Sequence, residues 1–288
     1  MQDNRNDQNS GEKLIDVEKV FQAKSPRLAR KIPLFIYNYL KRVVHQDDIN
    51  EAIRRFGKLQ GLDFVHAILD YMGVNITHEG IENIPVEGRF IIASNHPLGG
   101  LDGMALMQEV GKVRRDIVFP VNDLIMNIPN LLPLFIPINK HGSNSQNITI
   151  MNETFASDKA ILYFPAGLCS RKQHGKILDL EWKKTFVSKA RTYQRDIIPV
   201  HINGRNSDWF YNLANWRKRL GIKANIEMLY LVDEMYKQNN KNINIIFGKP
   251  IPWTIFDNRY PDLVWAQKVK KHVYNLENNI SAILDVNQ

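Results

Sequence analysis

The sequence predicts an α/β domain with a largely parallel mixed sheet flanked by helices, preceded by an N-terminal helical extension. Its 288 residues are 44% hydrophobic and 24% charged, an ordinary composition for a globular protein. Short apolar runs bounded by Gly, Pro or polar residues recur from residue 73 onward and suit buried strands. Segments with the apolar spacing of a helix lie between several of these runs, as connections between parallel strands require.

The expected elements can be given in chain order. The strands cover 73–78, 90–94, 117–121, 160–164, 197–202, 227–232 and 243–248. The helices between them cover 101–110, 145–156 and 180–193. No internal repeat or linker divides this region, so we expect residues 73–288 to form one domain.

The N-terminal region differs in composition. Residues 1–15 are rich in Asn, Asp and Gln, which indicates a disordered leader rather than a signal peptide. Residues 16–72 are expected to be helical, with an amphipathic helix from Pro33 to Val44 in basic surroundings. Aromatic and aliphatic residues beside basic charge suit a membrane surface, although a helix packed on the core with a solvated basic face explains the same pattern.

Charge and cysteine content narrow the function classes. The formal net charge of +8 suggests an anionic partner, which could be nucleic acid, a membrane surface or an acidic carrier protein. The single cysteine, Cys169, excludes an internal disulfide and a thiolate zinc cluster within the chain. No run reaches the roughly 18 apolar residues of a spanning helix. We therefore expect a peripheral protein on the cytoplasmic face of a membrane.

The most informative segment follows the strand at 90–94 and contains Asn95, His96, a Gly99–Gly100 pair and Asp102. Ligands of open α/β sheets bind at the carboxyl ends of strands, which places His96 well for chemistry. The glycine pair lets the loop bend back, so that the Asp102 carboxylate can orient the imidazole as a general base. A His at a strand end is often structural, however, and a His–Asp pair six positions apart is a weak signal alone.

This segment resembles the first motif of the PlsC-like glycerolipid acyltransferases, in which a His–Asp pair activates an acceptor hydroxyl to attack an acyl thioester. Three further segments match in the same order. They are 134–140, which is similar to the second motif, 164–170, which is similar to Phe-Pro-Glu-Gly-Thr-Arg-Ser, and the proline-containing strand 198–202. The resemblance covers about residues 90–205 and implies the fold of the glycerol-3-phosphate acyltransferases, with the acyltransferase domain over 73–288.

The resemblance also implies the site. His96 and Asp102 would be catalytic, and backbone N–H groups near Gly99 and Gly100 or near Gly167 could stabilise the oxyanion. The substrate-binding residues would be Asn95, Gly99, Gly100, Asn139, Lys140, Phe164, Pro165, Gly167, Ser170 and Arg171. We expect no metal and no cofactor, because the co-substrate is a thioester of acyl carrier protein or coenzyme A. The implied partners are a lysolipid acceptor, that acyl donor and a membrane surface, without nucleic acid.

Several departures from the family pattern concern the acceptor. Five residues instead of four separate His96 from Asp102, Ala166 stands in the place of Glu, and Cys169 and Lys140 replace arginines that hold a phosphate. An ammonium cannot bind phosphate bidentately as guanidinium does. The pattern is similar to a divergent branch labelled as haemolysins, which includes enzymes that acylate the hydroxyl of lyso-ornithine or lyso-glycine lipids. The head-group carboxylate of such a lipid could be bound by Arg171, Lys172 or Lys140, and a lysophosphatidate-like acceptor remains the other option.

Two other function classes stay open at this point. A basic nucleic-acid-binding protein would explain the charge but not the His–Asp segment. A lipid hydrolase or membrane-lytic protein would fit the haemolysin label, but the chain has no Gly-x-Ser-x-Gly motif. The basic, aromatic stretch from Trp209 to Lys223 suits a solvated helix over core aromatics, or a surface for lipid head groups or an acidic acyl carrier protein.

Overall fold

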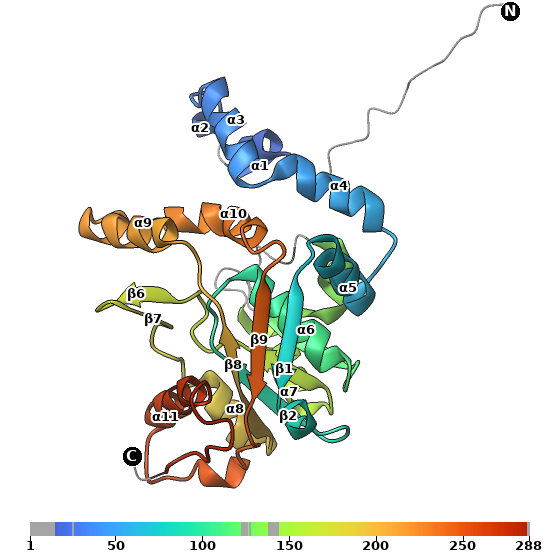
Figure 1. Cartoon of the computed structure of the whole chain (residues 1–288), viewed down its shortest axis with the longest axis vertical. Coiled ribbons are helices and arrows are strands. Elements are labelled where there is room, and N and C mark those ends of the chain that lie inside the picture. Colours follow the sequence, from blue (N-terminus) through green and yellow to red (C-terminus); the bar gives the residue numbers. More distant parts are fainter. Residues whose placement is uncertain (1–14, 25, 122–125, 127, 138–143, 287–288) are drawn as a thin grey trace, which may run out of the picture. The chain divides into compact units, whose positions relative to one another are not determined.

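The computed structural model describes residues 15–24, 26–121, 126, 128–137 and 144–286 (Figure 1). The chain divides into two compact units, Met1–Gly57 and Lys58–Gln288. The sequence placed the boundary between the helical extension and the α/β domain after residue 72, and the structure places it after Gly57. The reason is that helix α5 (Gly61–Tyr71) packs on helix α6 (Gly100–Gly111) and so belongs to the second unit. Among the described residues, no helix is both long and apolar enough to cross a membrane.

The first unit is helical. Its helices are α1 (Val17–Lys24), α2 (Pro26–Ala29), α3 (Leu34–Val43) and α4 (Gln46–Phe56). The buried Tyr37 organises the unit, since its hydroxyl donates to the Ala29 carbonyl over 3.1 Å and its ring meets Phe21 edge-on. The opposite side of α3 is apolar as well but faces solvent, with Leu34 and Phe35 exposed by 67% and 71%.

The second unit is built on a mixed sheet of mostly parallel strands, so the predicted fold class is confirmed. Among the described residues the sheet has seven strands in the order β1-β9-β8-β2-β5-β3-β4. Their bounds, in that order, are Asn75–Glu79, Asn242–Phe247, Asp196–Asn203, Phe90–Ser94, Ala160–Tyr163, Ile117–Val121 and Phe135–Pro137. The β8–β9 pair is antiparallel, and the remaining neighbours run parallel. A separate antiparallel hairpin joins β6 (Arg171–Gln173) and β7 (Lys176–Leu178).

Helices cover both faces of the sheet, which explains why strand β2 is buried at every residue. Helices α7 (Asn144–Ala156), α8 (Thr185–Tyr193) and α11 (Asp262–Asn275) pack on one face, and α5 and α6 lie on the other. Figure 1 shows α8 and α11 on one side of the sheet and α5 and α6 on the other. Alternate strand residues such as Ile91 and Ala93 pack in one cluster with Trp182 and Trp265. Short 3₁₀ helices lie in several of the connections, among them η1 (Ile81–Asn83), η3 (Pro129–Leu134) and η5 (Trp253–Ile255).

The strand predicted at 227–232 is wrong. This stretch forms the 3₁₀ helix η4 (Ile226–Tyr230) and the helix α10 (Leu231–Tyr236), which follow helix α9 (Asp208–Arg219). A short apolar run does not distinguish strand from helix by periodicity. Here two carboxylates seven residues apart, Glu227 and Glu234, are both fully buried, as expected for one face of a helical segment.

Candidate active site

His96 lies two residues beyond the end of strand β2, on the edge of the sheet where the parallel strands end. The Asn95 side chain fixes the start of its loop. The Asn95 amide donates to the Ile202 carbonyl over 2.9 Å and accepts from the Ile202 N–H over 2.7 Å, which extends the β2–β8 pairing by a side chain. Both polar ends of Asn95 are thus engaged, so it positions the loop instead of offering a free amide to a substrate.

Asp102 faces the imidazole from the first turn of α6. His96 Nδ1 lies 2.9 Å from Asp102 Oδ2, and that oxygen also accepts the N–H groups of Leu98 and Gly99 over 2.7 and 3.0 Å. The carboxylate is fully buried, whereas the His96 side chain remains 17% exposed. Within the described residues His96 Nε2 has no hydrogen-bond partner, so this nitrogen is available to a substrate.

Burial raises the pKa of Asp102 above its ordinary value, while the His96 hydrogen bond and the two N–H donors act in the opposite direction. A carboxylate that water solvates poorly is stabilised when the imidazole beside it gains a proton. The charged form of this buried carboxyl group therefore depends on its hydrogen bonds to His96, Leu98 and Gly99.

An aromatic residue fixes the plane of the imidazole. Phe164, which follows strand β5, stacks on His96 with ring centroids 4.1 Å apart and an angle of 19° between the planes. Phe119 of strand β3 meets Phe164 edge-on at 5.1 Å. Three neighbouring strands thus hold one imidazole, because β2 supplies it, β5 stacks on it and β3 supports the stack.

Asp179, which sequence reasoning missed, anchors the His96 backbone. The His96 N–H donates to Asp179 Oδ1 over 3.2 Å, and the Ser170 hydroxyl donates to the same oxygen over 2.6 Å. The Trp182 indole N–H donates to Asp179 Oδ2 over 2.8 Å. Since the Ser170 N–H also donates to the His96 carbonyl over 2.7 Å, Ser170 and Asp179 clamp both sides of this residue.

The segment Phe164–Gly167 forms a tight turn beside the stack. The Gly167 N–H donates to the Phe164 carbonyl over 3.0 Å, and Gly167 has a φ of 67° that favours glycine. Lys183 lies over this turn: its N–H donates to the Pro165 carbonyl over 3.0 Å, and a Cβ added to Gly167 would lie 3.3 Å from its Nζ. Lys183 is exposed and forms no ion pair within the described residues.

A sequence model of the Acyltransferase family matches residues 19–283 of this chain. The chain belongs to the Acyltransferase family. Its reaction class is acyl transfer, and the family resemblance predicted from the motifs is confirmed.

Two curated relatives resemble this acyltransferase over almost their whole length. Each is named lyso-glycine lipid O-acyltransferase and is 49% identical over 265 residues, or 91% of this chain. The protein of Bacteroides thetaiotaomicron is covered to 97%, and that of Phocaeicola vulgatus to 95%. Among solved structures, the 1-acyl-sn-glycerophosphate acyltransferase PlsC of Thermotoga maritima aligns with a TM-score of 0.49 and 18% identity, covering 92% of this chain and 88% of that one.

Substitution of Asp179 should lower the turnover of this acyltransferase, although Asp179 contacts only the His96 backbone and side chains behind it. We expect Asp179→Ala to reduce kcat far more than KM, because the imidazole loses its position while substrate contacts stay. Asp179→Asn keeps one acceptor oxygen and should be intermediate. Steady-state kinetics of both variants check this.

The matched control is Trp182→Phe, which removes a donor to Asp179 but keeps a ring in the core. It should retain most of kcat. Equal losses of kcat in Trp182→Phe and Asp179→Ala would assign the effect to general destabilisation instead.

The two loop glycines have different structural roles. Gly99 has φ 84° and ψ −128°, and an added Cβ would lie 3.1 Å from Leu231 Cδ2. Its N–H is already donated to Asp102, which contradicts the expectation that this group stabilises an oxyanion. Gly100 is exposed at the first turn of α6, and an added Cβ would meet nothing within 4 Å. The open side of this loop is therefore at Gly100.

A matched pair of substitutions separates these roles. We expect Gly99→Ala to lower the free energy of unfolding by about 1–3 kcal/mol through backbone strain and to inactivate the enzyme. Gly100→Ala should leave the unfolding free energy nearly unchanged, because a helical position with open space accepts a methyl group. Urea unfolding of both variants tests this, and equal stability of the two would contradict it.

The predicted role of Arg171 in binding a substrate carboxylate is contradicted by its contacts. Arg171 is nearly buried and pairs with the fully buried Glu227 over 3.0 Å, and Arg217 pairs with the same carboxylate over 2.7 Å. Arg171 also stacks on Phe210 and donates to the Cys169 carbonyl. This guanidinium is committed to an internal ion triad, which leaves it unavailable to a ligand. Lys172 pairs with Asp208 at 3.3 Å.

Cys169 is buried beside the same ring, and burial raises the pKa of its thiol to about 11. It is therefore a protonated core thiol at neutral pH. The predicted substrate-binding residues Asn139 and Lys140 lie outside the described residues.

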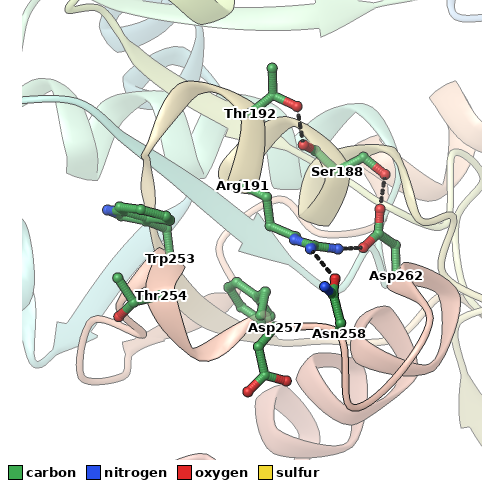
Figure 2. A pocket seen from close by; sticks show the side chains of 9 residues that line it. Ser188, Arg191, Thr192, Trp253, Thr254, Asp257, Asn258 and Asp262 are labelled. Atoms are coloured by element: carbon green, nitrogen blue, oxygen red, sulfur yellow. Dashed lines mark hydrogen bonds and ion pairs between the residues drawn. The ribbon is translucent and has the colours of Figure 1, made fainter.

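An open pocket of about 600 Å³ lies away from His96 (Figure 2). Arg191 of α8 reaches across it to Asp262 and Asn258, each at 2.8 Å. The pocket borders the start of strand β8, since the Trp253 N–H donates to Asp196 over 3.0 Å. Because β8 and β2 are parallel, this is the opposite edge of the sheet from the one that carries His96. We assign this pocket no part in acyl transfer.

Proposed function

We propose that this enzyme transfers a fatty acyl group from an acyl thioester to the hydroxyl of a lyso-glycine lipid, with His96 as general base. The 2.9 Å contact between His96 Nδ1 and Asp102 Oδ2 carries the chemical part of this proposal. The acceptor is supported by the two relatives of that name, which match this chain at 49% identity over nearly its full length.

The proposed step is direct transfer without a covalent enzyme intermediate. The proton of His96 rests on Nδ1 toward Asp102, so that Nε2 takes the proton of the acceptor hydroxyl. The oxygen attacks the thioester carbonyl, the carbon–sulfur bond breaks, and the departing thiolate takes the proton from the imidazolium. General-base assistance of this kind contributes about 10²–10⁴-fold to the rate.

The oxyanion of the tetrahedral intermediate needs N–H donors. We assign them to the first turn of α6, where the Gly100 backbone is exposed and the positive end of the helix dipole faces the His96 loop. Thiolate is a good leaving group, so the proposed mechanism involves neither a metal nor a further cofactor.

Lys183 is our candidate for the group that binds the acceptor carboxylate. Arg171 is committed to Glu227, whereas Lys183 presents its ammonium over the turn that supports the His96–Phe164 stack. An ammonium forms a strong charge-assisted hydrogen bond with a carboxylate. Lys183 would thus take over the anion-binding role of the arginine that other family members have at the position of Cys169.

Substitution of Lys183 tests that assignment. Lys183→Met should raise the KM for a carboxylate-bearing acceptor about tenfold, the effect of losing about 1.4 kcal/mol of binding. The KM for the acyl donor should not change. Lys184→Met, at the exposed next residue, is the control. An unchanged acceptor KM in Lys183→Met, or an equal rise in Lys184→Met, would contradict the role.

A membrane surface is the proposed location. Leu34 and Phe35 of α3 expose large apolar side chains next to Arg30 and Lys31, a combination that suits lipid with anionic head groups. We therefore propose peripheral attachment through helix α3.

The experiment that tests the function incubates the full chain with acyl carrier protein and coenzyme A thioesters in parallel. The acceptors are lyso-glycine lipid, lyso-ornithine lipid and lysophosphatidate, and mass spectrometry identifies which one gains a chain. We expect lyso-glycine lipid to be acylated fastest. Preference for lysophosphatidate would overturn the acceptor assignment, and no product from any acceptor would overturn the function.

A further inference from the structure

We propose that the outer face of helix α9, defined by Trp209, Trp216 and Leu220, docks on an anionic lipid bilayer and brings the His96 loop to its acceptor. This inference rests on the proposed function, because it needs an acceptor that resides in a membrane. The three side chains are 52%, 61% and 74% exposed.

The spacing of these residues makes them a single surface. They are seven and four positions apart, and the N–H of Leu220, which directly follows the last residue of α9, still donates to the Trp216 carbonyl over 2.9 Å. The three side chains therefore project from the same side of a helix with 3.6 residues per turn. The other side of α9 is apolar too and is buried, through Phe210, Tyr211 and Ala214. Helix α9 therefore has two apolar faces, of which the second unit covers only the inner one.

The surroundings of the outer face are apolar and basic. Ile222 and Leu229 are exposed by 41% and 44%, and the Trp209 ring meets Tyr230 edge-on at 6.2 Å. Three exposed cations follow at the carboxyl end of the helix: Lys218, Arg219 and Lys223. Tryptophan rings favour the membrane–water interface, and Lys and Arg near the surface attract anionic lipids.

The docking face lies next to the catalytic loop. Immediately before α9, the Asn206 side chain donates to the Pro97 carbonyl over 3.2 Å, and an added Cβ on Gly204 would lie 2.8 Å from Leu98. After α9, Leu231 of α10 lies against Gly99. Figure 1 shows α9 and α10 following one another at one end of the sheet. Contact of this face with a bilayer would thus hold residues 97–99 close to the lipid surface.

The centre of the face decides between its two candidate partners. An acidic acyl carrier protein would be bound chiefly by charge, yet the face itself consists of two indoles and a leucine, and the cations lie beside its carboxyl-terminal end. Exposed apolar area of this kind in a monomer marks an interaction site. A bilayer uses both features, because its interior accepts the apolar side chains and its head groups pair with the cations.

A local fluorescent probe tests the contact without relying on activity. Trp216→Cys and the control Ile283→Cys are each labelled with an environment-sensitive dye, since native Cys169 is only 1% exposed. Ile283 is 75% exposed and lies in the carboxyl-terminal segment. With vesicles of phosphatidylcholine and phosphatidylglycerol, we expect a blue shift and brighter emission at 216 and no change at 283.

The same probe separates the outcomes. Pure phosphatidylcholine vesicles should produce a smaller response at 216. No response at 216 to anionic vesicles, or an equal response at 283, would overturn the proposal. A response at 216 to holo-acyl carrier protein without vesicles, and none to vesicles, would assign the face to that protein and overturn it as well.

Activity supplies the second readout. The triple variant Trp209→Ser, Trp216→Ser, Leu220→Ser should lose about tenfold or more of its activity toward acceptor in vesicles, because the removed apolar area no longer enters lipid. Its activity toward acceptor in detergent should match wild type. The control double variant changes Leu263 and Val264 to Ser, which are exposed on α11. A wild-type enzyme that is inactive toward the acceptor both in vesicles and in detergent would contradict the proposed function. Equal activity of the triple variant and the wild type toward the acceptor in vesicles would contradict only the docking face.

Discussion

His96→Ala should lose at least about 10²-fold in acyl transfer, the lower end of the contribution of a general base. No other described residue reaches Asp102 with a group that can take up a proton. His96→Asn is the sharper variant, because its side-chain amide can still donate to Asp102 Oδ2 but cannot take a proton. Both variants should be equally inactive. Release of thiol from the acyl donor in the presence of acceptor measures the rate.

The control for this prediction is His66→Ala, which removes a partly exposed imidazole from α5. It should retain wild-type activity, and circular dichroism should show that all three variants are folded. Substantial transfer by His96→Asn would show that hydrogen bonding to Asp102 is sufficient and that no proton is taken by residue 96.

Asp102→Asn should also lose about 10²-fold or more of activity, without the loss of stability that a buried ion pair usually implies. Burial raises the pKa of the Asp102 carboxyl above its ordinary value of 3.8. As the pH rises, the unfolded chain gives up this proton first, and the folded state becomes relatively less stable until the folded pKa has been passed. Asparagine has no such proton.

The stability difference between the two proteins should therefore depend on pH in a defined direction. Going from pH 4 toward neutral, the unfolding free energy of Asp102→Asn should improve relative to wild type. Urea unfolding at a series of pH values measures this difference. A variant that becomes less stable relative to wild type as the pH rises would show that the carboxylate stabilises the fold in its charged form.

The sheet could be predicted from sequence where strands are buried on both faces. Strands such as β2 and β3 appear as unbroken apolar runs, and their bounds agree with the structure. The hairpin β6–β7 and the three-residue strand β4 are too short to produce a pattern. At 227–232 the apolar run was ambiguous, and the pairing of Glu227 with Arg171, 56 residues away, is a tertiary contact that no local pattern contains.

In the candidate site, too, contacts between residues close in sequence could be predicted, and contacts between distant segments could not. The approach of His96 to Asp102 spans six positions, and two glycines in the loop made the required bend foreseeable. Asp179 contacts His96 from 83 residues away, and Lys183 approaches Gly167 through the folding of a separate segment. Such positions acquire a role only once the chain is folded. The prediction that Arg171 binds substrate was wrong for a related reason. A basic residue beside a motif looks available in the sequence, and the sequence does not reveal that its partner Glu227 is buried next to it in the fold.

We propose that His96 directs an acyl group to a lipid hydroxyl and not to water. The most direct measurement follows an isotopically labelled acyl thioester with lyso-glycine lipid and the full-length enzyme, and quantifies label in acylated lipid and in free fatty acid by mass spectrometry. We predict that nearly all released label appears in the acylated lipid, and that His96→Ala releases almost none. Label found mainly as free fatty acid would contradict this role of His96, because the same His–Asp pair would then be activating water.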